Sequence, residues 1–146
     1  MSQNGENAEK AEARGRVLVI DDEADIRAAF KIVLTDAGFT VITAADGPEG
    51  IRKNTESDPD VIILDLKMPG MGGVEALREI RKTDQAVQVL ILTGYGDAAS
   101  IRAAVDLNVY EYVSKPFRNA MIIGAVREAL DEGGDGGGRG TRPTIE

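Results

Sequence analysis

The sequence predicts an α/β domain in which a parallel sheet of five strands is covered by helices on both faces. Short apolar runs alternate five times along the chain with segments whose apolar residues recur at helical spacing, which is typical of a parallel sheet. The first, third and fourth runs are almost wholly apolar, as expected for central strands that are buried on both faces. The connections between successive strands are expected to be right-handed crossovers.

The five expected strands are rich in β-branched and large apolar residues, which favour extended structure. The second and fifth runs alternate more between apolar and polar residues than the others, so they suit the edges of the sheet. In chain order the expected strands are RVLVI (16–20), FTVIT (39–43), DVIIL (60–64), VQVLIL (87–92) and VYEYV (109–113).

Each expected helix is marked by an apolar stripe or by a terminal signal. Gly38 is expected to end the first helix, because glycine readily takes the left-handed conformation found there. Gly47 and Pro48 are expected to open the second, since proline suits the first helical turn. The stripes of the other four helices are Ile26, Phe30, Val33, Leu34 and Ala37; Val74, Leu77 and Ile80; Ile101, Ala104 and Val105; and Ile122, Ala125, Val126, Ala129 and Leu130.

Length and composition fit one folded domain with polar ends. The chain has 146 residues, of which 42% are hydrophobic and 29% charged, as is common in globular proteins. Residues 1–15 are polar and lack apolar periodicity, so they predict a flexible lead-in. Residues 133–146 are rich in glycine and predict a tail or linker. The folded domain is therefore expected to span residues 16–132.

Missing residue types and the net charge exclude several classes of function. The chain has no cysteine and no histidine, which removes disulfides, Ser-His-Asp chemistry, zinc sites built on these residues and any phosphohistidine of its own. The net charge of −8 argues against direct nucleic-acid binding. No apolar stretch approaches the roughly 20 residues of a membrane span, and the polar N-terminus does not resemble a secretory signal. A cytoplasmic protein is therefore expected.

Polar and charged residues stand at the carboxyl ends of four expected strands. Asp21 and Asp22 follow the first strand, Asp65 the third and Thr93 the fourth, while Lys115 comes shortly after the fifth. In an open parallel sheet these strand ends share one rim, where ligands bind near the point at which the strand order reverses. The five residues are therefore expected to converge although they are scattered along the chain.

Such a cluster suits a divalent cation and phosphoryl transfer. Two or three carboxylates forced together repel and need a cation, and oxygen ligands without histidine or cysteine favour Mg²⁺. Lys115 adds a second positive charge and Thr93 a hydroxyl, which suits a reaction that depends on positioning and charge neutralisation. Asp65 ends an apolar run, where an unpaired charge would be costly. Its carboxylate is the candidate nucleophile and would form an aspartyl phosphate.

Each of these residues also has an ordinary structural interpretation. Asp21 and Asp22 can be the N-cap and first-turn charges of a helix, and Asp65 can be a turn residue. Lys115 can be a solvated loop lysine, and Thr93 can simply close its strand. The occurrence of all five at successive strand ends favours a site.

The motifs at the strand ends resemble the receiver domain of bacterial two-component response regulators. The resemblance covers about residues 16–132 and is carried, in chain order, by VLVIDDE, VIILDLKMPGMGG, LILTGYGD and YVSKPF. It implies a flavodoxin-like, doubly wound sheet with strand order 2-1-3-4-5 and helices on both faces.

The resemblance also implies how the phosphoryl group would be received. Asp65 resembles the phosphoacceptor, which takes its phosphoryl group from a phosphohistidine on a sensor histidine kinase or a histidine phosphotransfer protein. Asp21 and Asp22 resemble the acidic pair that holds Mg²⁺ together with Asp65, and the backbone carbonyl of Lys67 would be a further ligand. Lys115 would pair with the phosphate, and its bond to Pro116 is expected to be cis.

The same resemblance implies a switch. Thr93 and Tyr112 resemble the pair in which the aromatic ring swings inward when the hydroxyl moves toward the phosphoryl oxygens. The face formed by the fourth helix, fifth strand and fifth helix would then meet a partner. Such a domain catalyses only its own phosphotransfer and dephosphorylation. The downstream partner or output domain stays open, as do a phosphorylation-dependent homodimer and whether the chain stands alone or belongs to a longer regulator.

Three further positions vary within the resemblance. Lys67 stands two residues after Asp65, and Tyr95 stands two residues after Thr93. Both side chains are expected to overhang the pocket. Asn108 stands where many receiver domains have glycine, and asparagine tolerates the left-handed conformation that a tight turn there requires.

Two other classes of function fit the sequence less well. Phosphatases of the haloacid-dehalogenase type also use an aspartate at a strand end with Mg²⁺, but they place a second aspartate two residues later. Glu23 and Lys67 occupy the corresponding positions here, so that match fails. A dinucleotide-binding domain would need a G-x-G-x-x-G turn after the first strand, which the sequence lacks.

Overall fold

All five strands are parallel and lie in the order β2-β1-β3-β4-β5, which confirms the expected topology. The computed structural model describes residues 15–134, so all but the last residue of the expected lead-in and most of the expected tail lie outside the described residues. Each strand is short, and most of the strand residues taken together are partly or fully buried. The strands are β1 (Arg16–Ile20), β2 (Thr40–Ala44), β3 (Val61–Asp65), β4 (Gln88–Thr93) and β5 (Glu111–Ser114).

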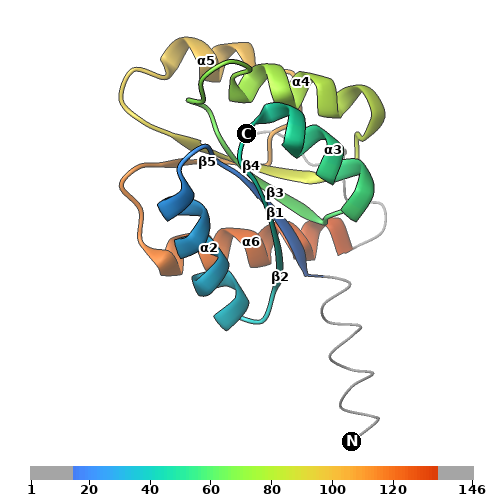
Figure 1. The fold of residues 1–146 in the computed structure, drawn as a ribbon, viewed down its shortest axis with the longest axis vertical. Helices are drawn as coiled ribbons and strands as arrows, with labels where there is room; N and C mark the ends of the chain where they lie inside the picture. Colours follow the sequence, from blue (N-terminus) through green and yellow to red (C-terminus); the bar gives the residue numbers. More distant parts are fainter. Residues whose placement is uncertain (1–14, 135–146) are drawn as a thin grey trace, which may run out of the picture.

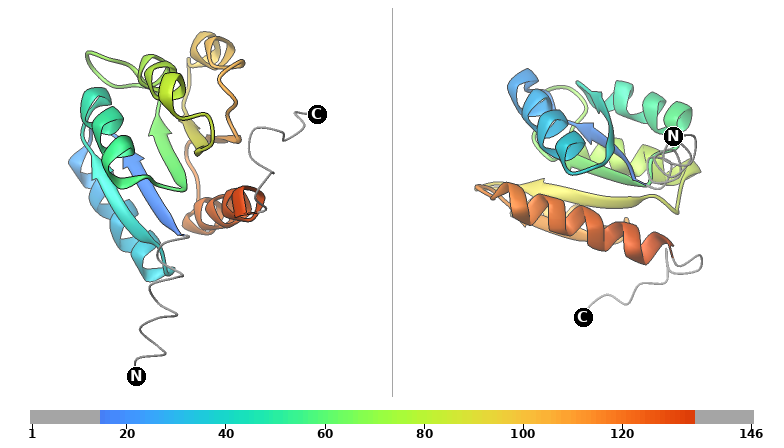
Figure 2. Two further views of the ribbon diagram at one scale, coloured as in Figure 1. Left: turned by 90° about the vertical axis from the view of Figure 1, so that its right-hand side faces the viewer. Right: turned by 90° about the horizontal axis from the view of Figure 1, so that it is seen from below.

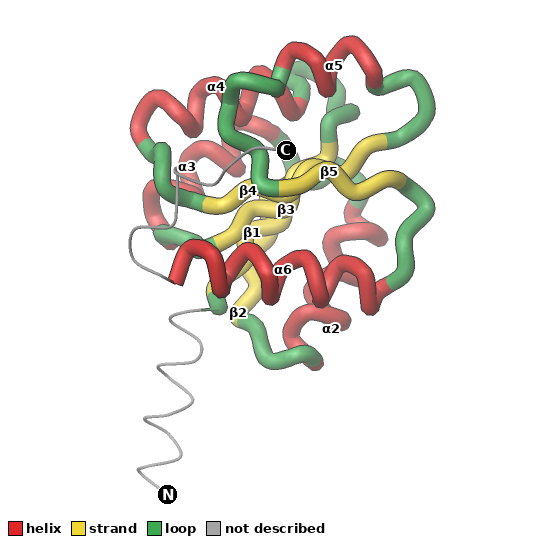
Figure 3. Tube along the Cα trace, turned by 180° about the vertical axis from the view of Figure 1, so that it is seen from behind, coloured by secondary structure: helices red, strands yellow, loops and turns green. Residues whose placement is uncertain are grey.

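A helix follows every strand, as the alternating pattern predicts. The helices α2 and α6 cover one face of the sheet, and α3, α4 and α5 cover the other (Figures 1 and 3). The right-hand view of Figure 2 shows α6 running alongside β4. The helices are α2 (Ala24–Asp36), α3 (Gly47–Ser57), α4 (Gly73–Thr83), α5 (Ala98–Ala103) and α6 (Asn119–Gly134).

Successive residues of the central strands enter two different hydrophobic cores. In β1, Val17 and Val19 pack toward α2 and α6, whereas Leu18 and Ile20 pack toward α3 and α4. Side chains alternate between the faces of a strand, so a strand buried on both faces must be apolar throughout. Residues 61–64 of β3 and 89–92 of β4 follow the same rule, with exposures of 0–1%.

The ends of several elements differ from the sequence expectation by one or two residues. The second, third and fourth strands each begin and end one residue later than expected, which places Asp65 and Thr93 inside their strands as the last residues. Helix α2 ends as expected, because Gly38 has a φ of 105° and its N–H bonds to the carbonyl of Thr35. Helix α6 continues to Gly134, beyond the expected end of the domain at residue 132.

The apolar stripe expected for α5 is only partly correct. Ala104 is buried, but Val105 is 76% exposed and the helix ends at Ala103. The fifth strand also begins at Glu111 rather than at residue 109, after Asn108, which has a φ of 60° as its side chain permits.

An arginine of α4 holds the segment that precedes β5. The guanidinium of Arg81 donates to the carbonyls of Leu107 and Asn108 at 2.8 and 2.9 Å and to the carbonyl of Asp84 at 3.1 Å. Burial lowers the pKa of Arg81, although the charge of Asp84 opposes this. These hydrogen bonds give partners on α4 to the carbonyls of Leu107 and Asn108, which lie beyond the end of the short helix α5.

Within residues 15–134, no helix combines the length and the apolar character needed to cross a bilayer.

Candidate functional site

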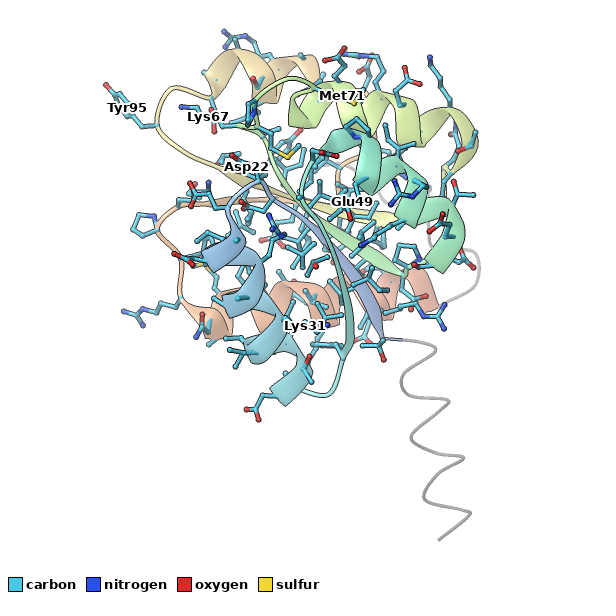
Figure 4. All side chains as sticks on the ribbon, viewed as in Figure 1. Asp22, Lys31, Glu49, Lys67, Met71 and Tyr95 are labelled. Carbon is cyan, nitrogen blue, oxygen red and sulfur yellow. The ribbon has the colours of Figure 1, made fainter. Side chains whose placement is uncertain are left out.

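Three aspartates meet at the carboxyl end of the sheet. Ile20 of β1 pairs with Leu64 of β3, so the residues that follow them, Asp21 and Asp65, lie side by side. With Asp22 they form a cluster in which one carboxylate oxygen of each lies within 4.8 Å of the others. Asp21 and Asp65 are 2% and 5% exposed, whereas Asp22 is exposed. Figure 4 shows Asp22 at this rim, above the first turn of α2.

Lys115 supplies the positive charge of the site. Its Nζ lies 2.9 Å from Oδ1 of Asp65, and its backbone N–H donates to the carbonyl of Thr93 at 2.8 Å. Burial alone would lower the pKa of Lys115, but the hydrogen bond and charge of Asp65, with the charges of Asp21 and Glu23, outweigh burial and raise it. The lysine is therefore held in its charged form beside the central carboxylate.

The charge balance of the cluster fits a divalent cation. Burial raises the pKa of Asp21, the hydrogen bond from the backbone N–H of Glu23 opposes this, and the charges of Asp65 and Asp22 add to the rise. One ammonium faces three carboxylates, so negative charge remains uncompensated. Hard oxygen ligands at this spacing suit Mg²⁺, which binds through a few carboxylates and keeps several waters. The residues present therefore fit the ion that the sequence predicted.

Replacing Asp21 with asparagine is expected to stabilise the metal-free protein while weakening Mg²⁺ binding. A carboxyl whose pKa is raised by folding binds more protons when folded, so its contribution to stability falls as pH rises from its ordinary value of 3.8 through the raised one. The neutral amide of the variant would avoid this cost and still accept the bond from Glu23. We expect a gain of roughly 0.5–2 kcal/mol at pH 7 in a chelator, measured by urea unfolding.

The gain should vanish near pH 3, where Asp21 is protonated in both states. Asp22→Asn, at an exposed position, is the control and should change stability little without metal. An Asp21→Asn variant less stable than the parent at pH 7 would contradict the charge balance described above.

A cleft opens beside the aspartates. Charged groups of Asp21, Glu23, Asp65 and Lys115 form one side of it. The other side is apolar, and the stacked rings of Phe117 and Phe30, with centroids 5.8 Å apart, continue it toward α2. Its apolar lining consists of Ile26, Leu92, Pro116 and Phe117. The phosphoacceptor candidate is therefore reached from a pocket that is polar on one side and apolar on the other.

Thr93 is near the cluster, but its hydroxyl faces another way. It ends β4 at 5% exposure, beside Ser114 of β5. Its Oγ1 donates to the carbonyl of Val113 at 3.4 Å, and Thr93 does not line the cleft. The hydroxyl therefore points toward β5 rather than toward Asp65 in this conformation.

Tyr112 and Pro116 complete the predicted set. Tyr112 lies in β5 beside Ile91 and packs, half-buried, against the core on the side of α3 and α4, and burial raises its pKa. The peptide bond between Lys115 and Pro116 is cis. Tyr112 does not line the cleft beside the aspartates, so the structure places it behind β4 and not in the site itself.

Lys67 and Tyr95 do not overhang the cleft, contrary to expectation. Tyr95 is 99% exposed and its ring points away from the molecule (Figure 4). The ammonium of Lys67 crosses instead to the loop between β4 and α5, where it donates to the carbonyl of Tyr95 at 3.0 Å. The position of Lys67 after β3 places its backbone at the rim, but the contact with the loop between β4 and α5 determines the direction of its side chain.

Two residues that were not predicted from the sequence also shape this rim. The guanidinium of Arg27 donates to the carbonyl of Asp21 at 2.8 Å and so fixes the turn that carries the acidic pair. Asp97 is 5% exposed and its Oδ2 accepts the N–H of Gly94 at 2.6 Å. Both signals were present: an arginine in the helix that follows the acidic pair, and an aspartate three residues after a loop glycine.

The chain belongs to the response regulator receiver domain family. The family model for the response regulator receiver domain matches residues 17–127, which contain the whole site described above and all of the fold except the first residue of β1 and the last turns of α6. Receiver domains are signalling switches that interact with histidine kinases and with downstream effectors, and the function of this chain is of that general class.

Relatives of two lengths support the assignment. The chain is 32% identical over 114 residues to the chemotaxis protein CheY of Thermotoga maritima, covering 77% of this chain and 95% of that one. It is 32% identical to the sporulation initiation phosphotransferase F of Bacillus subtilis, covering 79% and 93%. It is also 38% identical to a probable transcriptional regulator, ycf27, of Guillardia theta, covering 82% and 46%, so it spans about half the length of that longer relative.

Solved structures show the same fold. A response regulator receiver domain protein from Clostridium thermocellum has 38% identity and a TM-score of 0.76, with 80% of this chain and 94% of that chain covered. A CheY-like receiver domain protein from Methanospirillum hungatei has 27% identity and a TM-score of 0.80, with 84% and 98% covered. The doubly wound, flavodoxin-like architecture is therefore confirmed.

Proposed function

We propose that this receiver domain accepts a phosphoryl group on Asp65 from a phosphohistidine of a sensor histidine kinase or a histidine phosphotransfer protein. In the transfer, the P–N bond to the donor imidazole breaks, and a P–O bond to the carboxylate of Asp65 forms. The observation that carries the proposal is the position of Asp65, which lies at the centre of the acidic cluster with the ammonium of Lys115 2.9 Å from its Oδ1.

Each neighbour of Asp65 has a role in this proposal. Asp21, Asp22 and Asp65 hold Mg²⁺ with the backbone carbonyl of Lys67. The ion, when bound, offsets negative charge on the phosphoryl oxygens. Lys115 remains charged beside Asp65 and keeps its ammonium on the phosphoryl group once the acyl phosphate forms. The domain's chemistry is limited to its own phosphotransfer and dephosphorylation, so it acts as a switch and not as an enzyme with a diffusing substrate.

Phosphorylation changes the shape of the face formed by α5, β5 and α6, and this face binds the partner. Thr93 turns from the carbonyl of Val113 toward the phosphoryl oxygens, and the ring of Tyr112 fills the space behind it. The altered face binds a downstream protein or output domain, or a second phosphorylated copy of the chain. The proposal includes a cytoplasmic location, no contact with membrane and no direct contact with nucleic acid, and the net charge of −8 disfavours nucleic-acid binding.

Removing Mg²⁺ is expected to reduce phosphorylation of the domain to background. Without the ion the three carboxylates repel the incoming phosphoryl group, and only Lys115 opposes them within the cluster. The measurement is labelling by acetyl phosphate in Mg²⁺ and in excess chelator, followed by intact-protein mass spectrometry. Undiminished labelling in the chelator would refute the role of the metal.

Replacing Lys115 with alanine is expected to preserve Mg²⁺ binding but to uncouple the phosphoryl group from the α5–β5–α6 face. The variant loses the cation that links Asp65 to the start of the β5–α6 segment, while the three aspartates remain. The measurement is the change in backbone NMR shifts of β5 and α6 on phosphorylation. Lys31→Ala, on α2 and away from the cleft (Figure 4), is the control and should behave like the parent. Parent-like shift changes in Lys115→Ala would argue against coupling through the lysine.

A further inference from the structure

A charged cross-link joins the two loops that flank the site. Lys67 follows β3, and its ammonium donates to the carbonyl of Tyr95 at 3.0 Å and lies 3.7 Å from Oδ1 of Asp97. Figure 4 shows Lys67 reaching toward the loop that carries Tyr95. A Cβ placed on Gly96 would lie 3.9 Å from this ammonium, so the ammonium of Lys67 packs against the backbone of the loop.

The aspartate of this cross-link is buried and needs its partners. The side chain of Asp97 is 4% exposed, and a carboxylate buried in this way needs hydrogen-bond or charge partners. Its Oδ2 accepts the N–H of Gly94 at 2.6 Å, which closes residues 94–97 into a tight turn. Among residues 15–134, Lys67 is the cation that lies within ion-pair distance of it. The turn and the ammonium therefore stabilise each other.

The turn begins at the residue that follows Thr93. Because Gly94 is held by Asp97, and Asp97 by Lys67, the backbone beyond Thr93 is held where it is. In that arrangement the hydroxyl of Thr93 bonds to the carbonyl of Val113 and stays out of the cleft. A movement of the Thr93 backbone toward Asp65 would shift this turn, because Gly94 follows Thr93 directly.

We propose that Lys67 and Asp97 are positioning residues that form a latch, which holds the 94–97 loop and with it Thr93 in the conformation of the unphosphorylated domain. The latch opens before the hydroxyl can turn toward a phosphoryl group on Asp65. The inference rests on the proposed function for the direction of that movement. Because Lys67 is 65% exposed, the pair is partly screened, and opening it is a small cost that sets the balance between the two conformations.

The test compares Lys67→Met, Asp97→Asn and the double variant. The first substitution nearly keeps the length of the side chain and leaves the backbone carbonyl in place, and the second leaves an amide oxygen that can still accept the N–H of Gly94. Lys82→Met is the matched control, because Lys82 is equally exposed at 65% and pairs with Glu79 on α4 at 2.9 Å. It removes the same charge without touching either loop.

Two readouts are measured. The first is the hydrogen-exchange rate of the Gly94 amide in the free protein, which we expect Lys67→Met to increase. The second is the affinity for trifluoroberyllate with Mg²⁺, a mimic of the bound phosphoryl group, followed by NMR. Each single variant should bind it about two- to fivefold more tightly than the parent, and the double variant no more tightly than the better single one. Lys82→Met should match the parent in both readouts.

Parent-like exchange at Gly94, parent-like affinity in Lys67→Met, or fully additive effects in the double variant would each overturn the latch. A parent that does not bind trifluoroberyllate would instead contradict the proposed function. The latch would then be judged by exchange alone, where faster exchange in Lys67→Met but not in Lys82→Met supports it and equal rates refute it.

Discussion

Replacing Asp65 with asparagine is expected to abolish labelling of the domain by acetyl phosphate. Asparagine has nearly the same shape, but its amide offers no carboxylate oxygen to attack phosphorus. Removing one charge also relieves repulsion among the three clustered carboxylates, so the variant should remain folded. Intact-protein mass spectrometry after incubation with acetyl phosphate and Mg²⁺ measures the result.

Asp97→Asn is the matched control for this variant. It removes one charge from another buried carboxylate on the same rim, 5% exposed as Asp65 is, but outside the acidic cluster. It should still be labelled. Labelling of Asp65→Asn to the level of the parent would show that a different side chain receives the phosphoryl group.

Replacing Gly73 with alanine is expected to destabilise the fold by about 1–3 kcal/mol and to reduce labelling. Gly73 begins α4, and its N–H donates to the carbonyl of Leu66 at 3.1 Å. A Cβ there would lie 2.5 Å from the carbonyl oxygen of Asp65 and 2.8 Å from Cα of Leu66. These are backbone atoms that cannot turn aside, so either α4 or the end of β3 must move.

Gly124→Ala in α6 is the control, because a Cβ at Gly124 would meet no heavy atom within 4 Å apart from the neighbouring backbone of its own helix. Alanine favours the helix, so this variant should gain about 0.5–1 kcal/mol. Urea unfolding measures both variants. A Gly73→Ala variant as stable as the parent would mean that α4 does not need to approach β3 so closely.

The arrangement of strands and the convergence of the site were predictable from the sequence because both depend on simple regularities. Strands that are buried on both faces must be apolar throughout, and this property identified β1, β3 and β4 in the sequence as the central strands. Residues at the carboxyl ends of parallel strands lie at the same edge of the sheet. This rule predicted that Asp21 and Asp65 lie close together, as they do in the structure. The strand order and the cis bond before Pro116 came from the resemblance to receiver domains.

Details that depend on contacts between distant segments were not predictable. Val105 stands at helical spacing from Ile101, but spacing does not say whether another element covers that face, and Val105 is exposed. Lys67 and Tyr95 were expected over the cleft, but the course of each loop directs the lysine toward Asp97 and the tyrosine into solvent. For Asp97 the sequence offers only a local signal, its place three residues after Gly94, and that signal does not reveal that the turn buries the carboxylate.

The proposal that Asp65 receives the phosphoryl group is tested most directly by locating that group chemically. Borohydride reduces an acyl phosphate to an alcohol, so phosphorylated aspartate becomes homoserine, which peptide mass spectrometry can place in the sequence. After treatment with acetyl phosphate and Mg²⁺, we expect homoserine at position 65 and at no other aspartate. Homoserine at residue 21, 22 or 97, or none at residue 65, would contradict the proposal.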